Sequence, residues 1–200
     1  YVGSTGRHFY LKPRVLELGY AYLSSFNLVS IAQTHLEELT NKLHESCSVS
    51  VLQGHNVIYI CRAASKRIMT INLGVGAQLP AYATSMGRVL LASLSVFEIE
   101  DYFKTVKLEK LTPKTITDEK LLRAALAEIK KNGFAITIEE LEYGVQSVSI
   151  PIHGKNGLVI AAANVSAHAG RTSKEDLVSK FLPLLRDHVK EIELILQLQK

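Results

Sequence analysis

The sequence predicts an α+β fold, in which helices cover an antiparallel sheet of about six strands and a linker helix precedes the sheet. One reason is the order of the predicted elements, which runs helix, three strands, helices, three strands, helix. A second is that short polar turns join the strand segments, as they do between antiparallel neighbours. The 200 residues, 47% of them hydrophobic, also suffice to bury the core of one large domain or of one domain with an extension.

The N-terminal segment predicts the end of a β-hairpin followed by a helix. Residues 1–11 are rich in glycine and aromatic residues, and Pro13 suits the first turn of a helix. Apolar residues then recur at helical spacing at Val15, Leu16, Leu18, Tyr22 and Leu23. Because the chain starts at Tyr1 without a methionine, we expect a fragment in which this helix links an upstream part to the body.

The first core helix is predicted to start at Asn27 and to run to about Ser46. Its apolar stripe has three- and four-residue spacing, at Leu28, Ile31, Ala32, His35, Leu39 and Leu43. Three antiparallel strands are predicted next, at 47–53, 57–62 and 67–73, with a turn around Gly54 between the first two.

Three helices are predicted in the middle of the chain. One occupies residues 85–94, and a capping-box pattern of Ser95 with Glu98 starts a short one that runs through Phe103. The third covers 118–132 and ends at Gly133, with acidic residues in its first turn and lysines in its last.

Three more strands and a long helix complete the prediction. The strands lie at 134–138, 145–152 and 158–166, and the last should be central because it is almost continuously apolar. A capping-box pattern of Thr172 with Glu175 predicts the start of the final helix, which Pro183 should kink or split.

The stretch LPAYATSMGRVLLASL at 79–94 carries the clearest sign of a binding site, at the predicted start of the helix 85–94. A helix start leaves backbone N–H groups without intrahelical partners. Thr84 or Ser85 could cap the helix, or the N–H groups could hold an anion. A helix start that faces a sheet encloses a small cavity, which suits the sensing of a small molecule.

Signatures of catalysis are missing from the sequence. G-x-S-x-G does not occur, Ser85 is followed three positions later by Arg88 rather than lysine, and 74–79 lacks the third glycine of a dinucleotide loop. The acidic run at 139–142 is interpreted as a solvated loop rather than an acid/base pair. We therefore expect no enzyme activity and no cofactor.

The histidines and cysteines predict neither a metal site nor a disulfide. The seven histidines lack metal-ligand spacing, and His35 and His188 lie on helix stripes, where packing is the expected role. Cys47 and Cys61 flank a predicted hairpin and are expected to be free thiols in a reducing compartment. No apolar run approaches the ~20 residues of a membrane span and no signal-peptide pattern is present, so we expect a cytoplasmic protein.

Several motifs resemble the effector-binding part of the IclR family of bacterial transcription regulators. They are LPAYATSMGRVLLA at 79–92, G-x-Q-S-V-S-I-P-I at 144–152 and the helix RVLELGYAYLSS at 14–25. KRIM at 66–69 and ESCSVSVL at 45–52 are similar to the branch that regulates protocatechuate, 4-hydroxybenzoate and β-ketoadipate catabolism. The resemblance implies a curved, GAF-like sheet, with residues 1–26 as the end of a wing and a linker helix and 27–200 as the effector-binding domain.

The resemblance also implies where a small organic acid binds. Its carboxylate would meet the backbone N–H groups of Ser85 and Met86, which shifts the balance from a plain cap toward an anion site. Further pocket positions carried over from the family are Thr137, Ser147, Asn164 and Ser166. Several relatives have an acid, a cysteine and a serine where this chain has Thr137, Ser147 and Asn164, so its effector need not be glyoxylate or pyruvate. The alternative role for these four side chains is hydrogen bonding to neighbouring backbone.

The implied partners are operator DNA, contacted through an N-terminal helix-turn-helix that this chain lacks, and further copies of the chain in a dimer or tetramer. The net charge of +4 permits nucleic-acid contact without requiring it. Two other functions fit the same elements, namely an enzyme or carrier of small molecules and a purely structural oligomerisation module. Ligand stabilisation and turnover would distinguish them.

Overall fold

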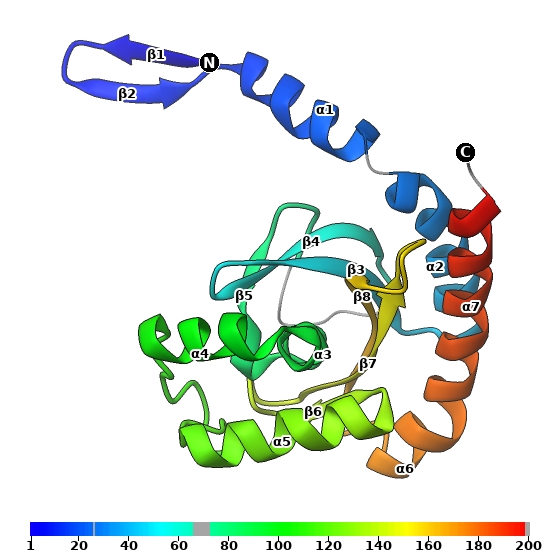
Figure 1. Ribbon diagram of the computed structural model, residues 1–200. Helices are drawn as coiled ribbons and strands as arrows, with labels where there is room; N and C mark the ends of the chain where they lie inside the picture. The colour runs from blue at the N-terminus through cyan, green and yellow to red at the C-terminus, as the bar shows by residue number, and fades with distance from the viewer. Residues whose placement is uncertain (26, 66–72, 199–200) are drawn as a thin grey trace.

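The computed structural model describes residues 1–25, 27–65 and 73–198. A six-stranded antiparallel sheet forms the body, with helices on both faces, and an N-terminal hairpin and helix project away from it (Figure 1). The predicted α+β class and the number of strands are therefore confirmed.

The sheet has the strand order β5-β4-β3-β8-β7-β6. As predicted from its apolar run, β8 is central, and it pairs with β3 on one side and β7 on the other. The predicted strand at 67–73 lies outside the described residues except for Leu73, and β4 pairs with β5, which the sequence did not predict as a strand. The strands are β3 Ser46–Gln53, β4 Asn56–Ala63, β5 Gln78–Pro80, β6 Ala135–Ile138, β7 Val145–His153 and β8 Val159–His168.

Two helices, α2 Asn27–Leu43 and α7 Leu182–Leu198, pack side by side on one face of the sheet (Figure 1). Their buried residues include Leu36, Leu39 and Leu185, which join a core cluster with the β3 and β8 side chains Val49 and Val165. The apolar core on this face is the larger of the two, and it packs the sheet against α2 and α7.

The opposite face is covered by α3 Ser85–Ser93, α4 Val96–Thr105 and α5 Glu119–Asn132. The predicted local signals are confirmed here: Ser95 and Glu98 form a capping box at the start of α4, and Gly133 ends α5 with a left-handed φ of 74°. The position of α3 matters most, because its N-terminus points at the sheet.

The start of the C-terminal helix differs from the prediction. Ser173 and Asp176 form the capping box, one residue later than Thr172 and Glu175. Thr172 is buried, and its carbonyl accepts a hydrogen bond of 2.5 Å from Gln146 Nε2, so the chain is still tied to β7 at that point. The helix is then split as expected near Pro183, by a π turn at Leu177–Phe181 that follows the short α6 Lys174–Asp176.

The N-terminal arm consists of the hairpin β1 Val2–Thr5 and β2 His8–Leu11, a 3-10 turn and α1 Leu16–Ser25. It leaves large apolar side chains in solvent, with Leu16 72% exposed and Tyr20 76% exposed. Within the described part of the chain, no single helix is long and apolar enough to cross a membrane.

The two cysteines are free thiols, as predicted, and both are buried. Cys47 pairs in register with Ala63, and Cys61 pairs with Val49, so the two thiols do not face one another across the hairpin. Burial raises the pKa of Cys47 to about 12 and that of Cys61 to about 11.

Candidate ligand-binding site

The N-terminus of α3 combines a side-chain cap with free backbone donors. Thr84 is the cap residue, and its Oγ1 accepts a hydrogen bond of 3.1 Å from the Gly87 N–H. The N–H groups of Ser85 and Met86 have no intrahelical acceptor because they lie in the first turn. A cap and an anion site are thus compatible here. Thr84 caps the helix, and the N–H groups of Ser85 and Met86 are the donors for an anion.

Gly87 is required by the close approach of the preceding turn. A Cβ on Gly87 would lie 2.1 Å from the Ala81 carbonyl oxygen, which belongs to the 3-10 turn Ala81–Ala83. The preceding turn and the helix therefore pack closely at this glycine. The turn and the helix start are consequently held as one unit against the sheet.

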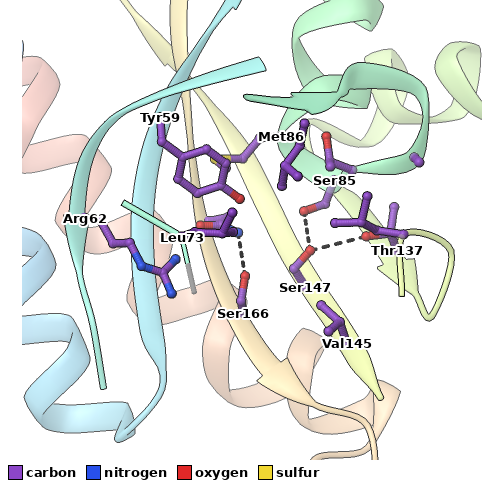
Figure 2. Close-up of a pocket in the computed structure, with 14 residues that line it drawn as sticks. Tyr59, Arg62, Leu73, Ser85, Met86, Thr137, Val145, Ser147 and Ser166 are labelled. Atoms are coloured by element: carbon purple, nitrogen blue, oxygen red, sulfur yellow. Dashed lines mark hydrogen bonds between the residues drawn. The ribbon is translucent and has the colours of Figure 1, made fainter. Parts of the chain in front are cut away.

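All six residues predicted from the sequence lie around one cavity between the start of α3 and the sheet (Figure 2). Ser85 and Met86 come from α3, Thr137 from β6, Ser147 from β7, and Asn164 and Ser166 from β8. The cavity has a volume of about 30 Å³, which is small beside the ~300–1,000 Å³ of ordinary ligand pockets.

Hydroxyl groups in the cavity bond to one another. Ser85 Oγ lies 2.6 Å from Ser147 Oγ and 2.6 Å from Ser149 Oγ, and Ser147 Oγ lies 3.2 Å from Thr137 Oγ1. These side chains therefore hydrogen-bond to neighbouring protein groups, as the alternative to ligand binding predicted. Their partners, however, are side chains rather than the backbone. A ligand that enters would exchange these bonds for its own.

The amide of Asn164 is only half satisfied. Its Nδ2 donates to Ser166 Oγ at 2.7 Å, whereas its buried Oδ1 has no hydrogen-bond partner among the described residues. A buried amide oxygen without a partner costs about 1–3 kcal/mol. The group is thus ready to accept a hydrogen bond from a ligand hydroxyl.

Two cavity residues on β4, Tyr59 and Arg62, were not predicted from the sequence. Burial raises the pKa of Tyr59 to about 12, so its phenol is a protonated donor at neutral pH. Burial also lowers the pKa of Arg62, whose Nη1 donates to Ser48 Oγ at 3.1 Å while its Nε is buried without a hydrogen-bond partner among the described residues. No carboxylate in the described ranges lies within ion-pairing distance of this guanidinium.

A β-bulge explains why strand periodicity misses Arg62. Side chains three positions apart on a regular strand point to opposite faces, so Tyr59 and Arg62 should be separated. The register between β3 and β4 shifts at Val49/Ser50, which leaves Ile60 as the extra residue. The shift returns Arg62 to the face of Tyr59, and Figure 2 shows its guanidinium across the cavity from Ser85.

The acidic run at 139–142 contains a buried ion pair, which corrects the expectation of a solvated loop. Glu140 is only 8% exposed and accepts from the Arg88 guanidinium, with Nη1 to Oε1 at 2.7 Å, and from the Ile116 N–H at 3.2 Å. Arg88 also donates to the Tyr82 carbonyl at 2.8 Å. Arg88 is thus neutralised by protein groups, in contrast to Arg62.

The cavity suits an organic anion rather than a metal ion. Its described lining contains a guanidinium, a phenol, hydroxyls and an amide but no histidine, cysteine, aspartate or glutamate side chain. Positive donors without a counter-charge among the described lining residues favour a negatively charged ligand.

Comparison with known proteins identifies the family of the chain. Residues 20–194 match the family described as "Bacterial transcriptional regulator IclR C-terminal". The chain belongs to the IclR family. Among curated members, it is 40% identical over 186 residues to the Pca regulon regulatory protein of Pseudomonas putida, a match that covers 92% of this chain. The match spans 64% of that relative's length, so the relative contains sequence beyond this region.

Two solved structures superpose on 98% and 82% of the chain. A protein described as a transcriptional regulator from Rhodococcus sp. RHA1 has a TM-score of 0.88 at 47% identity, covering 98% of this chain and 78% of that one. A PobR inducer-binding domain from Acinetobacter, a double mutant in complex with 3-hydroxybenzoic acid, has a TM-score of 0.78 at 31% identity, covering 82% of this chain and 97% of that one.

Proposed function

We propose that this chain is the effector-binding and oligomerisation region of an IclR-type bacterial transcription regulator and that it senses a small aromatic or dicarboxylic acid. The observation that carries the proposal is the cavity lined by the six predicted residues, together with the Arg62 guanidinium on its far side, which has no carboxylate partner among the described residues and whose Nε has no hydrogen-bond partner among them. We expect binding without turnover, because the described cavity lining holds no histidine or carboxylate that could activate a nucleophile.

The acid is oriented by donors at two ends of the cavity. Its carboxylate binds the N–H groups of Ser85 and Met86, where the helix dipole adds to the attraction. Arg62 and Tyr59 bind a hydroxyl, keto or second carboxylate oxygen at the other end, and Asn164 Oδ1 accepts from a ligand hydroxyl. The names of the relatives support acids of aromatic catabolism, and we propose protocatechuate, 4-hydroxybenzoate and β-ketoadipate as the candidates.

Binding requires the cavity to expand. A volume of about 30 Å³ leaves no room for a benzoate ring, so the Ser85–Ser147 hydrogen bond must open and the α3 start must move relative to β7. The displacement acts on the rest of the molecule through Arg88 and Glu140, which connect α3 to the segment after β6. We propose that this coupling carries the signal of the bound acid.

The remaining parts of the proposal concern assembly. Residues 1–26 form the end of a wing and a linker helix, and residues 27–200 form the effector-binding domain. The exposed apolar side chains of α1, which include Leu16 and Tyr20, support pairing with a second copy. We propose that the whole protein is cytoplasmic and binds operator DNA through a segment that precedes this chain.

The proposal is tested by isothermal titration of the chain with 3- and 4-hydroxybenzoate, protocatechuate, β-ketoadipate and their methyl esters. We expect one acid to bind with one molecule per chain, unchanged after incubation, and its ester to bind far more weakly because the ester removes the charge. Equal binding of acid and ester, or conversion of the acid into a product, contradicts the proposal.

A further inference from the structure

A second cluster of polar side chains lies between α2 and α7, on the face of the sheet remote from the cavity. Each helix carries a His-x-x-Glu sequence, His35 with Glu38 and His188 with Glu191. Residues three apart share a helix face. The helices run antiparallel, since His35 meets Glu191 whereas Lys42, one turn beyond Glu38, meets His188. Both motifs therefore converge on one point.

The two imidazoles have the separation of metal ligands. His35 Nδ1 and His188 Nδ1 lie 3.4 Å apart, with the ring planes at 72°. Two nitrogens bound at ~2.0–2.1 Å to a tetrahedral ion lie about 3.3–3.4 Å apart. The separation of the two nitrogens therefore already matches that of a ligated pair.

Carboxylates complete the set from both helices. Glu191 Oε2 lies 3.4 Å from His35 Nδ1, and Glu38 Oε2 lies 4.0 Å from His188 Nδ1. The ligand atoms of His35, Glu38 and His188 all lie within 4.8 Å of one another. Each histidine thus faces a glutamate of the other helix, as in a site built across a helix pair.

Burial divides the cluster into fixed and adjustable ligands. The side chains of His188 and His35 are 7% and 13% exposed, whereas those of Glu38 and Glu191 are 55% and 64% exposed. Packing holds the imidazoles in place, and the carboxylates can swing in from a groove between the helices that is open to solvent. The groove provides an entry path for an ion.

We propose that His35, His188, Glu38 and Glu191 form a binding site for a divalent transition-metal ion of the zinc class. Two imidazole nitrogens select such ions over Mg²⁺ and Ca²⁺, which prefer all-oxygen ligands. The two carboxylates balance the charge of the ion. The sequence predicted packing as the role of the two histidines, and their edge-to-face contact is the ion-free state of the same arrangement.

Lys42 sets the affinity of this site. Its Nζ lies 3.3 Å from His188 Nε2, and an ammonium can only donate, so neutral His188 carries its proton on Nδ1. A metal ion needs Nδ1 free and moves the proton to Nε2, which then repels the ammonium. Lys42 must leave His188 when the ion binds, so it competes with the metal.

The bound ion joins α2 to α7. Because α2 follows the N-terminal arm in the chain, the ion stabilises the helix pair at the base of that arm. The site is separated from the acid cavity by the sheet, so it works independently of the proposed effector.

The test is titration of the chelator-treated 200-residue chain with Zn²⁺ by calorimetry, and with Co²⁺ by visible absorption, which reports four-coordinate geometry. We expect one ion per chain, and at least about 10-fold weaker binding for His35→Gln and Glu38→Gln. The matched control Glu37→Gln, on the same helix, should bind as the parent does, and Lys42→Gln should bind more tightly. His188 is left intact because it is buried in the helix contact.

A thermal-unfolding series separates ligation from packing. Zn²⁺ should raise the unfolding temperature of the parent chain and of Glu37→Gln but leave that of His35→Gln unchanged. Binding to several ions per chain that is insensitive to His35→Gln and Glu38→Gln overturns the proposal, as does weaker binding after Lys42→Gln.

Discussion

Arg88, which has a carboxylate partner, and Arg62, which has none among the described residues, allow a direct comparison of structural and ligand-binding roles. Arg88 is 3% exposed and is neutralised by Glu140. Arg62 is partly buried at the cavity, and its Nε has no hydrogen-bond partner in the part of the chain that the structure describes. We consider the replacement of each by methionine, which retains the apolar stem and removes the charge.

The stability changes should differ sharply. Arg88→Met leaves the Glu140 carboxylate buried without its counter-ion, which costs about 3–5 kcal/mol in the free energy of unfolding. Arg62→Met loses one hydrogen bond to Ser48, but it also removes a desolvated charge with an unsatisfied donor, and each effect is worth about 1–3 kcal/mol. The two effects oppose each other, so we expect a net change within about 1 kcal/mol.

The effect on ligand binding should be the reverse. Arg62→Met removes the charged partner of an enclosed ligand oxygen. This loss costs about 2–5 kcal/mol of binding free energy and weakens binding of the acid by at least about 30-fold. Arg123→Met is the control, because its guanidinium pairs with Glu100 and Glu119 on the outer helices. Surface pairs contribute about 0–1 kcal/mol, so both its stability and its acid binding should stay near those of the parent.

The assays are urea unfolding for stability and isothermal titration with the acid that the parent chain binds. A loss of 3 kcal/mol or more from Arg62→Met, comparable to the cost of about 3–5 kcal/mol expected for Arg88→Met, refutes the conclusion that no buried carboxylate among the described residues depends on Arg62. Unchanged acid affinity in a folded Arg62→Met chain refutes its role in the ligand site.

Three further predictions address the cavity, a buried thiol and assembly. Ser147→Leu should fill the small cavity and abolish acid binding by calorimetry, whereas Ser85→Ala should weaken it only modestly because the carboxylate is held by backbone N–H groups; equal effects would contradict the backbone anchor. Burial raises the pKa of Cys47 to about 12 from 9.0, so between these pH values the thiol ionises only in the unfolded chain. The contribution of this thiol to the free energy of unfolding is therefore complete below pH 9.0 and is lost as the pH rises toward 12. Urea unfolding at pH 8 and pH 10 should show that Cys47→Ala loses less stability between the two pH values than the parent chain does. The chain should sediment as a dimer or tetramer, and replacing Leu16 and Tyr20 by serine should shift it toward monomer, while a concentration-independent monomer of the parent would exclude pairing through α1.

The local signals in the sequence determined most of the elements. Alternation placed the β7 segment, an apolar run made β8 central, and short-range capping chemistry set the start of α4 and the end of α5. Motif resemblance identified the six cavity residues, and all of them line the same cavity. These features could be predicted because periodicity and capping act over a few residues.

The tertiary structure decided which charges are buried and which way β4 faces. Glu140 is far from Arg88 in the sequence, and only the packing of α3 against the segment after β6 brings the two together. The bulge at Ile60 turns Arg62 into the cavity because β3 and β4 pair out of regular register there. The His35 and His188 rings meet only because α2 and α7, at opposite ends of the domain sequence, pack on one face of the sheet. In each case the free energy depends on a partner that is distant along the chain, which no local pattern encodes.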